Sequence, residues 1–251
     1  MKTERVRVDL LLVERGLAAS RAKAQALIMA GAVSSQGRRV DKVGTLLDRT
    51  AELHVSGEAS RFVSRGGDKL DAALSAFQAA GLDVAGTTAL DIGAGTGGFT
   101  DCLLARGAAR IYAVDVGYGQ LADRVRHDPR VVVRERTNAK ALSAADFPEP
   151  IDLVVVDASF IGLAKLMPAI VSVLRPGGAL VALIKPQFEA GRAAASRGRG
   201  VIRDQVTREA AIAEGRAAVA DAGLSVKAEV DSAVPGRKGN VERFVYALRI
   251  S

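Results

Sequence analysis

Short apolar runs that alternate with helical stretches constrain the fold of this 251-residue chain more than any other feature. From Asp68 onward the hydrophobic pattern switches repeatedly between the period of a strand and the period of a helix. The runs that we expect to be strands are Thr88–Ile92, Ile111–Asp115, Arg130–Arg134, Leu153–Asp157, Ala179–Ile184, Ser225–Val230 and Arg243–Leu248. Strands joined through helices lie parallel in one sheet, so the pattern predicts a doubly wound α/β domain.

The connection between the last two runs differs from the others. Only the turn-rich segment Ser232–Asn240 separates them, which is too short for a crossover helix. We therefore expect the final strand to lie antiparallel to its neighbour.

The first 60 residues are predicted to form a separate, smaller α+β domain. A helix containing Leu11 and Leu12 should end at Gly16, and Ser20 should cap a second helix. The expected strands are Val33–Val40, which reverses at Gln36-Gly37, and Leu53–Val55. The predicted organisation is a domain at residues 1–60, a linker at 61–67 and the α/β domain at 68–251.

Charge is distributed unevenly between these two parts. Residues 1–66 hold 12 Lys+Arg against 7 Asp+Glu, whereas the remaining 185 residues hold 23 against 21. A small basic module beside a nearly neutral one is typical of nucleic-acid binding, although a solvated basic surface gives the same count.

The basic module resembles the S4-type RNA-binding domain. The resemblance rests on LLVERGLAASRAKAQALIMAGAV, followed by GRRV and KVG, over roughly residues 6–58. The turn SSQG departs from the asparagine-glycine turn common in such domains. The basic residues expected to contact RNA are Arg15, Arg21, Lys23, Arg38, Arg39 and Arg65.

A glycine-rich turn follows the first strand of the α/β domain. Gly93, Gly95 and Gly98 allow backbone N–H groups to approach a ligand at a helix N-terminus. Asp115 ends the second strand and could accept hydrogen bonds from ribose hydroxyls. This spacing fits a dinucleotide as well as S-adenosylmethionine, so the spacing leaves both cofactors open.

Asp91 favours S-adenosylmethionine over a dinucleotide. A carboxylate just before the first glycine would repel a pyrophosphate, yet it can orient the ammonium group of a methionine moiety. The phrase DIGAGTGGFT also resembles the first motif of S-adenosylmethionine methyltransferases. The residues expected to bind this cofactor are Asp91, Gly93, Gly95, Gly97, Gly98, Phe99, Asp115, Asn138 and Asp157.

Three charged residues are expected at the same edge of the sheet. Asp157 and Lys185 end parallel strands, and Glu242 begins the antiparallel one. Lys69 lies at the start of the helix that leads into the sheet, where an acidic residue would be more usual. Each residue alone is most simply a structural ion-pair partner. The four residues together, beside a glycine-rich turn, are better explained by catalysis. A ribose 2′-hydroxyl must lose its proton as it attacks a methyl group. A lysine whose pKa is lowered by burial and by a neighbouring cation can serve as the base.

The whole chain resembles the TlyA family, whose members are named haemolysins but act as ribosomal RNA 2′-O-methyltransferases. The resemblance rests on FVSRGGDKL, DIGAGTGGFTDCLLARGA, YAVDVGYGQL, ERTNAK, DLVVVDASFI, LIKPQFE and GNVE, in that order. It implies a Rossmann-like, FtsJ-like seven-stranded sheet and a Lys-Asp-Lys-Glu tetrad at Lys69, Asp157, Lys185 and Glu242. It further implies methylation of cytidine in 16S and 23S ribosomal RNA, and sensitivity to capreomycin-type antibiotics.

The segment after Lys185 is rich in glycine, alanine and arginine. Residues 186–203 could form a loop that closes over RNA, although a plain solvated loop is equally consistent with the composition. The arginines of this segment are Arg192, Arg197, Arg199 and Arg203. Phe188 and Phe160 could stack on a base, with core packing the expected role of Phe160.

Three other functions remain as alternatives. A membrane-lytic protein would need a spanning or insertion segment, and the chain shows none. A non-catalytic RNA-binding assembly factor would have no reason to keep paired charges beside the cofactor turn. An NAD-dependent enzyme is opposed by Asp91. The lone Cys102, the lack of a His/Cys cluster for zinc and the polar start MKTERVRVDL lead us to expect a cytoplasmic protein without a structural metal.

Overall fold

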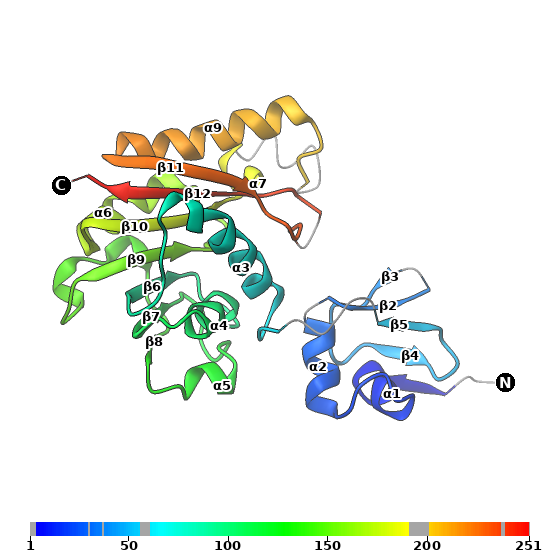
Figure 1. The fold of residues 1–251 in the computed structure, drawn as a ribbon. Coiled ribbons are helices and arrows are strands. Elements are labelled where there is room, and N and C mark those ends of the chain that lie inside the picture. Colours follow the sequence, from blue (N-terminus) through cyan, green and yellow to red (C-terminus); the bar gives the residue numbers. More distant parts are fainter. Residues whose placement is uncertain are drawn as a thin grey trace. The chain divides into compact units, whose positions relative to one another are not determined.

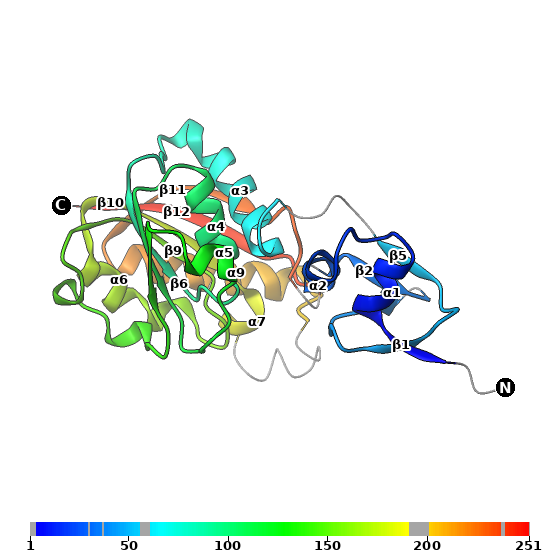
Figure 2. The same ribbon diagram turned by 90° about the horizontal axis from the view of Figure 1, so that it is seen from below.

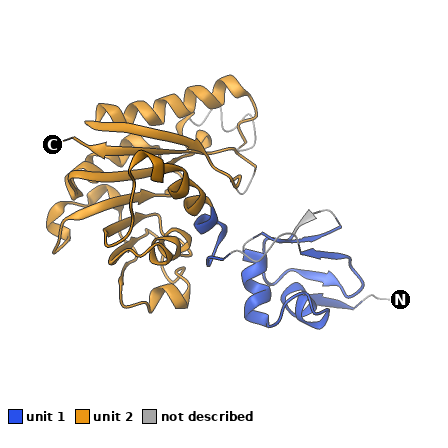
Figure 3. Ribbon diagram, in the orientation of Figure 1, with its two compact units in different colours: residues 1–68 blue, residues 69–251 orange. Residues whose placement is uncertain are grey.

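The computed structural model describes residues 4–29, 31–36, 38–55, 61–190, 201–236 and 239–250. The chain forms two compact units, residues 1–68 and 69–251 (Figure 3). Their boundary falls inside helix α3 (Arg65–Phe77), which therefore begins within the segment 61–67 that the sequence suggested as a linker. Gly66 and Gly67 in the first turn conceal this helix start, because glycine is a poor helix former.

The described residues of the first unit form two helices and two small antiparallel sheets, apart from the start of α3. Its elements are β1 (Arg5–Arg7), α1 (Val8–Glu14), α2 (Arg21–Met29), β2 (Val33–Ser35), β3 (Arg38–Arg39), β4 (Leu46–Asp48) and β5 (Leu53–Val55). The sheets are β3-β2-β5 and β1-β4. The predicted cap is present, because Ser20 Oγ accepts a 3.2 Å hydrogen bond from the backbone of Lys23. The apolar faces of both helices form one core that includes Leu11, Leu12, Leu27 and Ile28.

The second unit is built on a seven-stranded sheet with the order β11-β12-β10-β9-β6-β7-β8. The strands are β6 (Thr88–Ile92), β7 (Arg110–Val114), β8 (Val131–Arg134), β9 (Ile151–Val156), β10 (Leu174–Ile184), β11 (Leu224–Asp231) and β12 (Arg243–Arg249). Strand β12 lies between β10 and β11 and is antiparallel to both, while the other pairs are parallel. The predicted sheet, including its antiparallel final strand, is thus confirmed.

Helices cover both faces of this sheet (Figures 1 and 2). One face carries α3, α4 (Gly98–Ala105) and α5 (Asp123–Arg126), and the other carries α6 (Met167–Val173), α7 (Pro186–Glu189) and α9 (Gln205–Asp221). Short 3-10 helices occupy Gln78–Ala80, Ala139–Ala141, Ala144–Asp146 and, as η4, Leu163–Lys165. None of the helices in the described ranges is both long and apolar enough to cross a membrane.

The side chains of strand β12 point alternately to the two faces of the sheet and pack against the helices on both. The ring centroid of Phe244 lies 6.0 Å from that of Phe99 on α4, and the ring centroid of Tyr246 lies 5.6 Å from that of Phe77 on α3. Val245, on the opposite face, joins the core cluster that α9 completes. Burial on both faces accounts for the nearly continuous apolar sequence of this strand.

Candidate active site

Strand register brings three charged residues to one edge of the sheet. Asp157 directly follows β9, and Lys185 directly follows β10. Strand β12 runs the opposite way, and its pairing of Arg243 with Ile184 places Glu242 across from Lys185. The carboxyl ends of parallel strands are where open α/β sheets position their chemistry.

The charged side chains form two short ion pairs. Lys185 Nζ lies 2.7 Å from Asp157 Oδ1, and Lys69 Nζ lies 2.6 Å from Glu242 Oε2. The Lys69, Lys185 and Glu242 side chains are 11 % exposed or less, while that of Asp157 is 27 % exposed. Buried charges of this kind are tolerated only when they are paired, and the loss of one partner leaves the other uncompensated. Lys69 therefore has a specific partner despite its unusual place in the first half of α3.

Two neutral side chains complete these pairs. Lys185 Nζ also donates to the backbone carbonyl of Asp157 and to Ser159 Oγ, each at 3.0 Å. Gln187 Nε2 donates to Glu242 Oε1 at 3.3 Å, so the segment after Lys185 reaches the second ion pair. The sequence reasoning missed Ser159 and Gln187. Their signal was position, because each lies two residues beyond a charged strand end.

The glycine-rich turn lies against the same edge. Gly93, Gly95 and Gly97 have φ values of +87°, +51° and +91°, which favour glycine. A Cβ atom at Gly93 would lie 3.0 Å from the backbone of Asp157 and Ala158. Gly98 begins α4, so the turn presents a helix N-terminus. The expected cofactor turn and the Asp157–Lys185 pair are therefore neighbours.

Asp115 is held by the turns on either side of it. Its Oδ2 accepts a 2.8 Å hydrogen bond from Gly95 N, and its Oδ1 accepts one of 2.6 Å from Gly117 N. A small cavity beside it is also lined by Gln120 and Leu121. Each carboxylate oxygen has a second lone pair, so Asp115 can still accept hydroxyl donors there.

Asp91 is fully buried and only half satisfied. Thr100 Oγ1 donates to its Oδ2 at 2.6 Å, while Oδ1 has no hydrogen-bond partner within the described part of the chain. The pKa of Asp91 is raised to about 7, mainly by burial. The hydrogen bond from Thr100 opposes this rise, and the charges of Asp157 and Asp115 contribute to it. A buried acceptor of this kind is costly unless a ligand supplies a donor.

Phe99 and Asn138 serve visible structural roles. Phe99 is 2 % exposed and packs in the core against Phe244. Asn138 is exposed, and its Oδ1 accepts a 3.1 Å hydrogen bond from the backbone of Lys140. Any contact of either residue with a cofactor remains a prediction.

The expected core role of Phe160 is wrong. Its side chain is 91 % exposed, and its φ is +67°, in the turn that follows β9. The Phe160 ring lies 5.2 Å from that of Phe188, and Lys185 Nζ lies 5.9 Å from the Phe188 ring. Apolar character alone suggested burial, but in this turn Ala158 and Ile161 pack against the core whereas Phe160 does not. An aromatic pair, in which Phe160 is exposed and Phe188 is partly buried, thus lies next to Lys185.

The predicted RNA-contacting residues lie mostly in the first unit. Arg21 donates to Asp9 at 2.8 Å, and Arg15 donates to the carbonyl of Ala51 at 2.6 Å, so both arginines also stabilise that unit. Asp9, fully buried, has its pKa held well below the ordinary value, chiefly by its hydrogen bond to Arg7. Lys23 is exposed, and Arg65 begins α3.

Several of the predicted arginines lie where the side chain is not described. Arg38 and Arg39 form β3, but their side chains lie outside the described residues. The same holds for residues 191–200, which include Arg192, Arg197 and Arg199, while Arg203 is described and exposed. Their proposed contacts with RNA stay predictions.

Comparison with known proteins agrees with this geometry. Residues 62–249 match the FtsJ-like methyltransferase family, and residues 6–53 match the S4 domain. The chain is 47% identical over 244 residues to the 16S/23S rRNA (cytidine-2′-O)-methyltransferase TlyA of Mycobacterium tuberculosis, which covers 96% of this chain and 89% of the relative. It is 40% identical over 244 residues to Hemolysin A of Brachyspira hyodysenteriae, covering 97% of this chain and 100% of the relative. A solved structure of a protein named as a hemolysin, from Streptococcus thermophilus, superposes with a TM-score of 0.77 at 40% identity over 99% of this chain and 90% of the other.

Proposed function

Because the chain belongs to the TlyA family of FtsJ-like methyltransferases with an S4 domain, we propose that it methylates the ribose 2′-hydroxyl of ribosomal RNA. The chain is a methyltransferase, and S-adenosylmethionine is its proposed methyl donor. We propose cytidine in 16S or 23S ribosomal RNA as the target, following the M. tuberculosis relative. An enzyme with this substrate works where ribosomes are, so the proposal includes a cytoplasmic location.

The observation that carries the proposal is the pair of ion pairs beside the glycine turn. The contacts Lys185–Asp157 and Lys69–Glu242 involve four charged residues at one sheet edge, and Asp157 lies next to Gly93. Ion pairs that served stability alone would have no reason to collect at the carboxyl ends of strands beside a ligand turn.

Asp91 on β6 and Asp115 after β7 fit the proposed cofactor. The unpartnered oxygen of Asp91 would accept a hydrogen bond from the methionine ammonium group, and Asp115 would accept the ribose hydroxyls. The glycines allow the backbone to approach closely. When bound, S-adenosylmethionine supplies an electrophilic methyl group on a positively charged sulfur.

The charged residues would then handle the substrate hydroxyl. A ribose hydroxyl is a weak nucleophile, so a nearby group must receive its proton during attack. We assign this role to Lys185 after its ammonium group has given up a proton, and Asp157 and Ser159 position its Nζ through three contacts. Lys69 and Glu242 would form the second ion pair at the same sheet edge as Lys185. Alignment of the hydroxyl with the methyl group supplies much of the remaining rate enhancement.

The aromatic pair Phe160 and Phe188 would hold the target nucleotide. Phe160 and Phe188 present tilted rings beside Lys185, and unstacked bases bind aromatic rings of this kind. Such stacking would place a ribose close to the charged pairs without reading the base itself.

The decisive test is substitution of Lys185 in single-turnover methylation of ribosomal RNA. Lys185→Ala should lower the rate by about two to four orders of magnitude, the usual contribution of a positioned acid or base. Lys185→Arg should not restore it, because a guanidinium keeps its proton near neutral pH. Mapping of the methylated nucleotide identifies the target. A Lys185→Ala enzyme as fast as the wild type would reduce this lysine to a structural ion-pair partner.

The cofactor assignment is tested separately by calorimetry. Asp115→Ala should weaken binding of S-adenosylhomocysteine by roughly 1.5–3 kcal/mol, because hydrogen bonds to a charged acceptor are lost. Tight binding of NAD in place of S-adenosylhomocysteine would contradict the assignment.

A further inference from the structure

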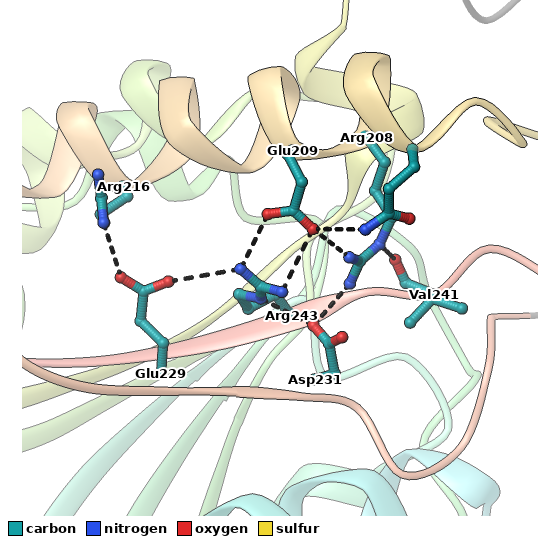
Figure 4. Close-up of polar contacts among 8 residues, drawn as sticks. Arg208, Glu209, Arg216, Glu229, Asp231, Val241 and Arg243 are labelled. Carbon is teal, nitrogen blue, oxygen red and sulfur yellow. Dashed lines mark hydrogen bonds and ion pairs between the residues drawn. The ribbon is translucent and has the colours of Figure 1, made fainter.

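A buried arginine on α9 contacts the segment that carries Glu242. Arg208 is 6 % exposed and lies in the first turns of that helix. Its Nε donates to the backbone carbonyl of Val241 at 3.0 Å, and its terminal nitrogens contact Asp231 at 2.6 Å and Glu209 at 2.5 Å (Figure 4). One side chain thus bonds to α9, to β11 and to the residue immediately before Glu242.

A second arginine shares the same carboxylates from the other side of Glu242. Arg243 Nε donates to Asp231 Oδ1 at 2.7 Å, and its Nη1 donates to Glu209 Oε2 at 3.1 Å. Two cations and two carboxylates therefore alternate around the start of β12 (Figure 4). Arg216 and Glu229, 3.5 Å apart, continue the network along the helix away from Val241.

These contacts fix the peptide groups on both sides of Glu242. Arg208 holds the carbonyl of Val241, and the backbone N–H of Ser232 donates to the carbonyl of Glu242 at 2.8 Å. The orientation of the two peptide planes determines where the Cα–Cβ bond between them points. In this structure that bond directs the carboxylate of Glu242, which is almost fully buried, onto Lys69 Nζ.

Packing of α9 does not by itself require a charge at this position. Ile212 and Val219 on the same helix pack into the apolar core. A buried guanidinium loses hydration and is stable only when its donors are paired. Arginine is the side chain whose rigid, diverging N–H groups can hold a carbonyl and two carboxylates at once.

We infer that Arg208 is a positioning residue for methyl transfer, which sets the Glu242 carboxylate against Lys69 by clamping the peptide before it. This inference rests on the proposed function, because it requires Glu242 to contribute to the reaction.

The experiment measures single-turnover methylation at saturating RNA and S-adenosylmethionine for Arg208→Met, Arg208→Lys, Glu242→Gln and the double variant Arg208→Met/Glu242→Gln. Arg208→Met should be about tenfold to a hundredfold slower than the wild type, as expected for a small misplacement of a catalytic group. Arg208→Lys keeps the charge but cannot hold the three acceptors, so it should also be slow. Affinity for S-adenosylhomocysteine should stay at the wild-type value. In the Glu242→Gln background, Arg208→Met should cause no further loss of rate.

Two variants of α9 serve as matched controls. Arg216→Met removes a cation from the same network without touching Val241 and should keep the wild-type rate. Val219→Ala loosens the packing of the helix through a buried apolar side chain and should lower the melting temperature but not the rate.

Each outcome separates this inference from the proposed function. A wild-type rate for Glu242→Gln would overturn the proposed role of Glu242 and this inference with it. A slow Glu242→Gln enzyme together with fast Arg208 variants would overturn only the inference. The inference also fails if the double variant loses the product of the two single losses, or if Val219→Ala is as slow as Arg208→Met. If Arg208→Met does not fold, Arg208→Lys decides.

Discussion

Asp91 combines a fully buried carboxyl with one unpartnered oxygen, and its protonation is therefore coupled to folding. Its pKa is raised from 3.8 to about 7 in the folded chain, mainly by burial. The folded protein holds this proton more tightly than the unfolded chain does, so the carboxyl reduces stability progressively as the pH rises from 3.8 toward 7. Asp91→Asn should remove this loss and raise the melting temperature of the ligand-free protein at neutral pH. A variant with an unchanged or lower melting temperature there would contradict the assignment.

Cofactor binding should also depend on whether Asp91 is protonated, but binding should strengthen, rather than weaken, as the carboxyl loses its proton. If the Asp91 carboxylate holds the methionine ammonium group, affinity for S-adenosylhomocysteine should fall as the pH drops below 7. The same affinity in Asp91→Asn should be lower and should lose this pH dependence. Calorimetry between pH 6 and pH 8 measures both, within about one unit of that pKa. Methylthioadenosine, which lacks the ammonium group, is the control ligand, and a slope retained in the variant would refute the contact.

For single residues, the sequence predicted where the charged side chains lie better than how they interact. Asp157, Lys185 and Glu242 could be chosen because parallel strand ends share an edge, and a strand end is visible as the last residue of an apolar run. The pairing of Lys69 with Glu242 joins residues 173 positions apart, and no local pattern encodes such a contact. The contact of Ser159 with Lys185 and the unpartnered oxygen of Asp91 depend on side-chain geometry, which appears only in three dimensions.

The turn between β9 and η4 carries Ser159 and Phe160, and one carboxylate anchors it. Glu189 Oε1, at the end of α7, accepts a 2.9 Å hydrogen bond from the backbone N–H of Leu163. Glu189→Ala should free this turn, separate Phe160 from Phe188 and lower single-turnover methylation by about tenfold, because small displacements of substrate-holding groups are costly. Hydrogen exchange of residues 158–163 should accelerate in parallel.

Glu189→Gln is the matched control for this prediction. Burial and the nearby charge of Glu214 raise the pKa of Glu189, so a neutral side chain is well tolerated at this position. The glutamine oxygen can still accept from Leu163 N, and the variant should keep the wild-type rate and exchange protection. If Glu189→Ala behaved like Glu189→Gln, the anchor would have no part in holding the turn.

Elements with strong periodicity were predictable, and very short ones were not. All seven strands of the large sheet were located, since each is an apolar run bounded by helical or turn-rich segments. β1 and β4 were missed because each has three residues and β1 reads Arg-Val-Arg, without an apolar run. Their pairing comes from tertiary context, in which β1 leads directly into α1.

The whole molecule divides its tasks between two units with separate cores. Val8, Leu12 and Ile28 belong to the core of the first unit, and the core of the second is centred on the sheet. Most of the net positive charge lies in residues 1–66, whereas every proposed catalytic and cofactor residue lies in residues 69–251. Composition predicted this division, because charge asymmetry is a property of the sequence. The sequence placed the start of the second domain at residue 68, and the two compact units divide after that residue, within α3.

This division predicts that RNA affinity and cofactor affinity can be changed independently. Removal of residues 1–60 should abolish methylation of ribosomal RNA and flatten the salt dependence of RNA binding, while S-adenosylhomocysteine binding is retained. In the full chain, Lys23→Ala should weaken RNA binding and reduce the salt slope by about one, because a single phosphate contact is lost. Lys227→Ala, at an exposed position on β11, removes the same charge from the second unit and should leave the slope unchanged. Filter binding over a range of salt concentrations distinguishes the two variants. Equal slopes for Lys23→Ala and the wild type would show that this lysine does not contact phosphate, and a truncated protein that still methylated ribosomal RNA would require another role for the first unit.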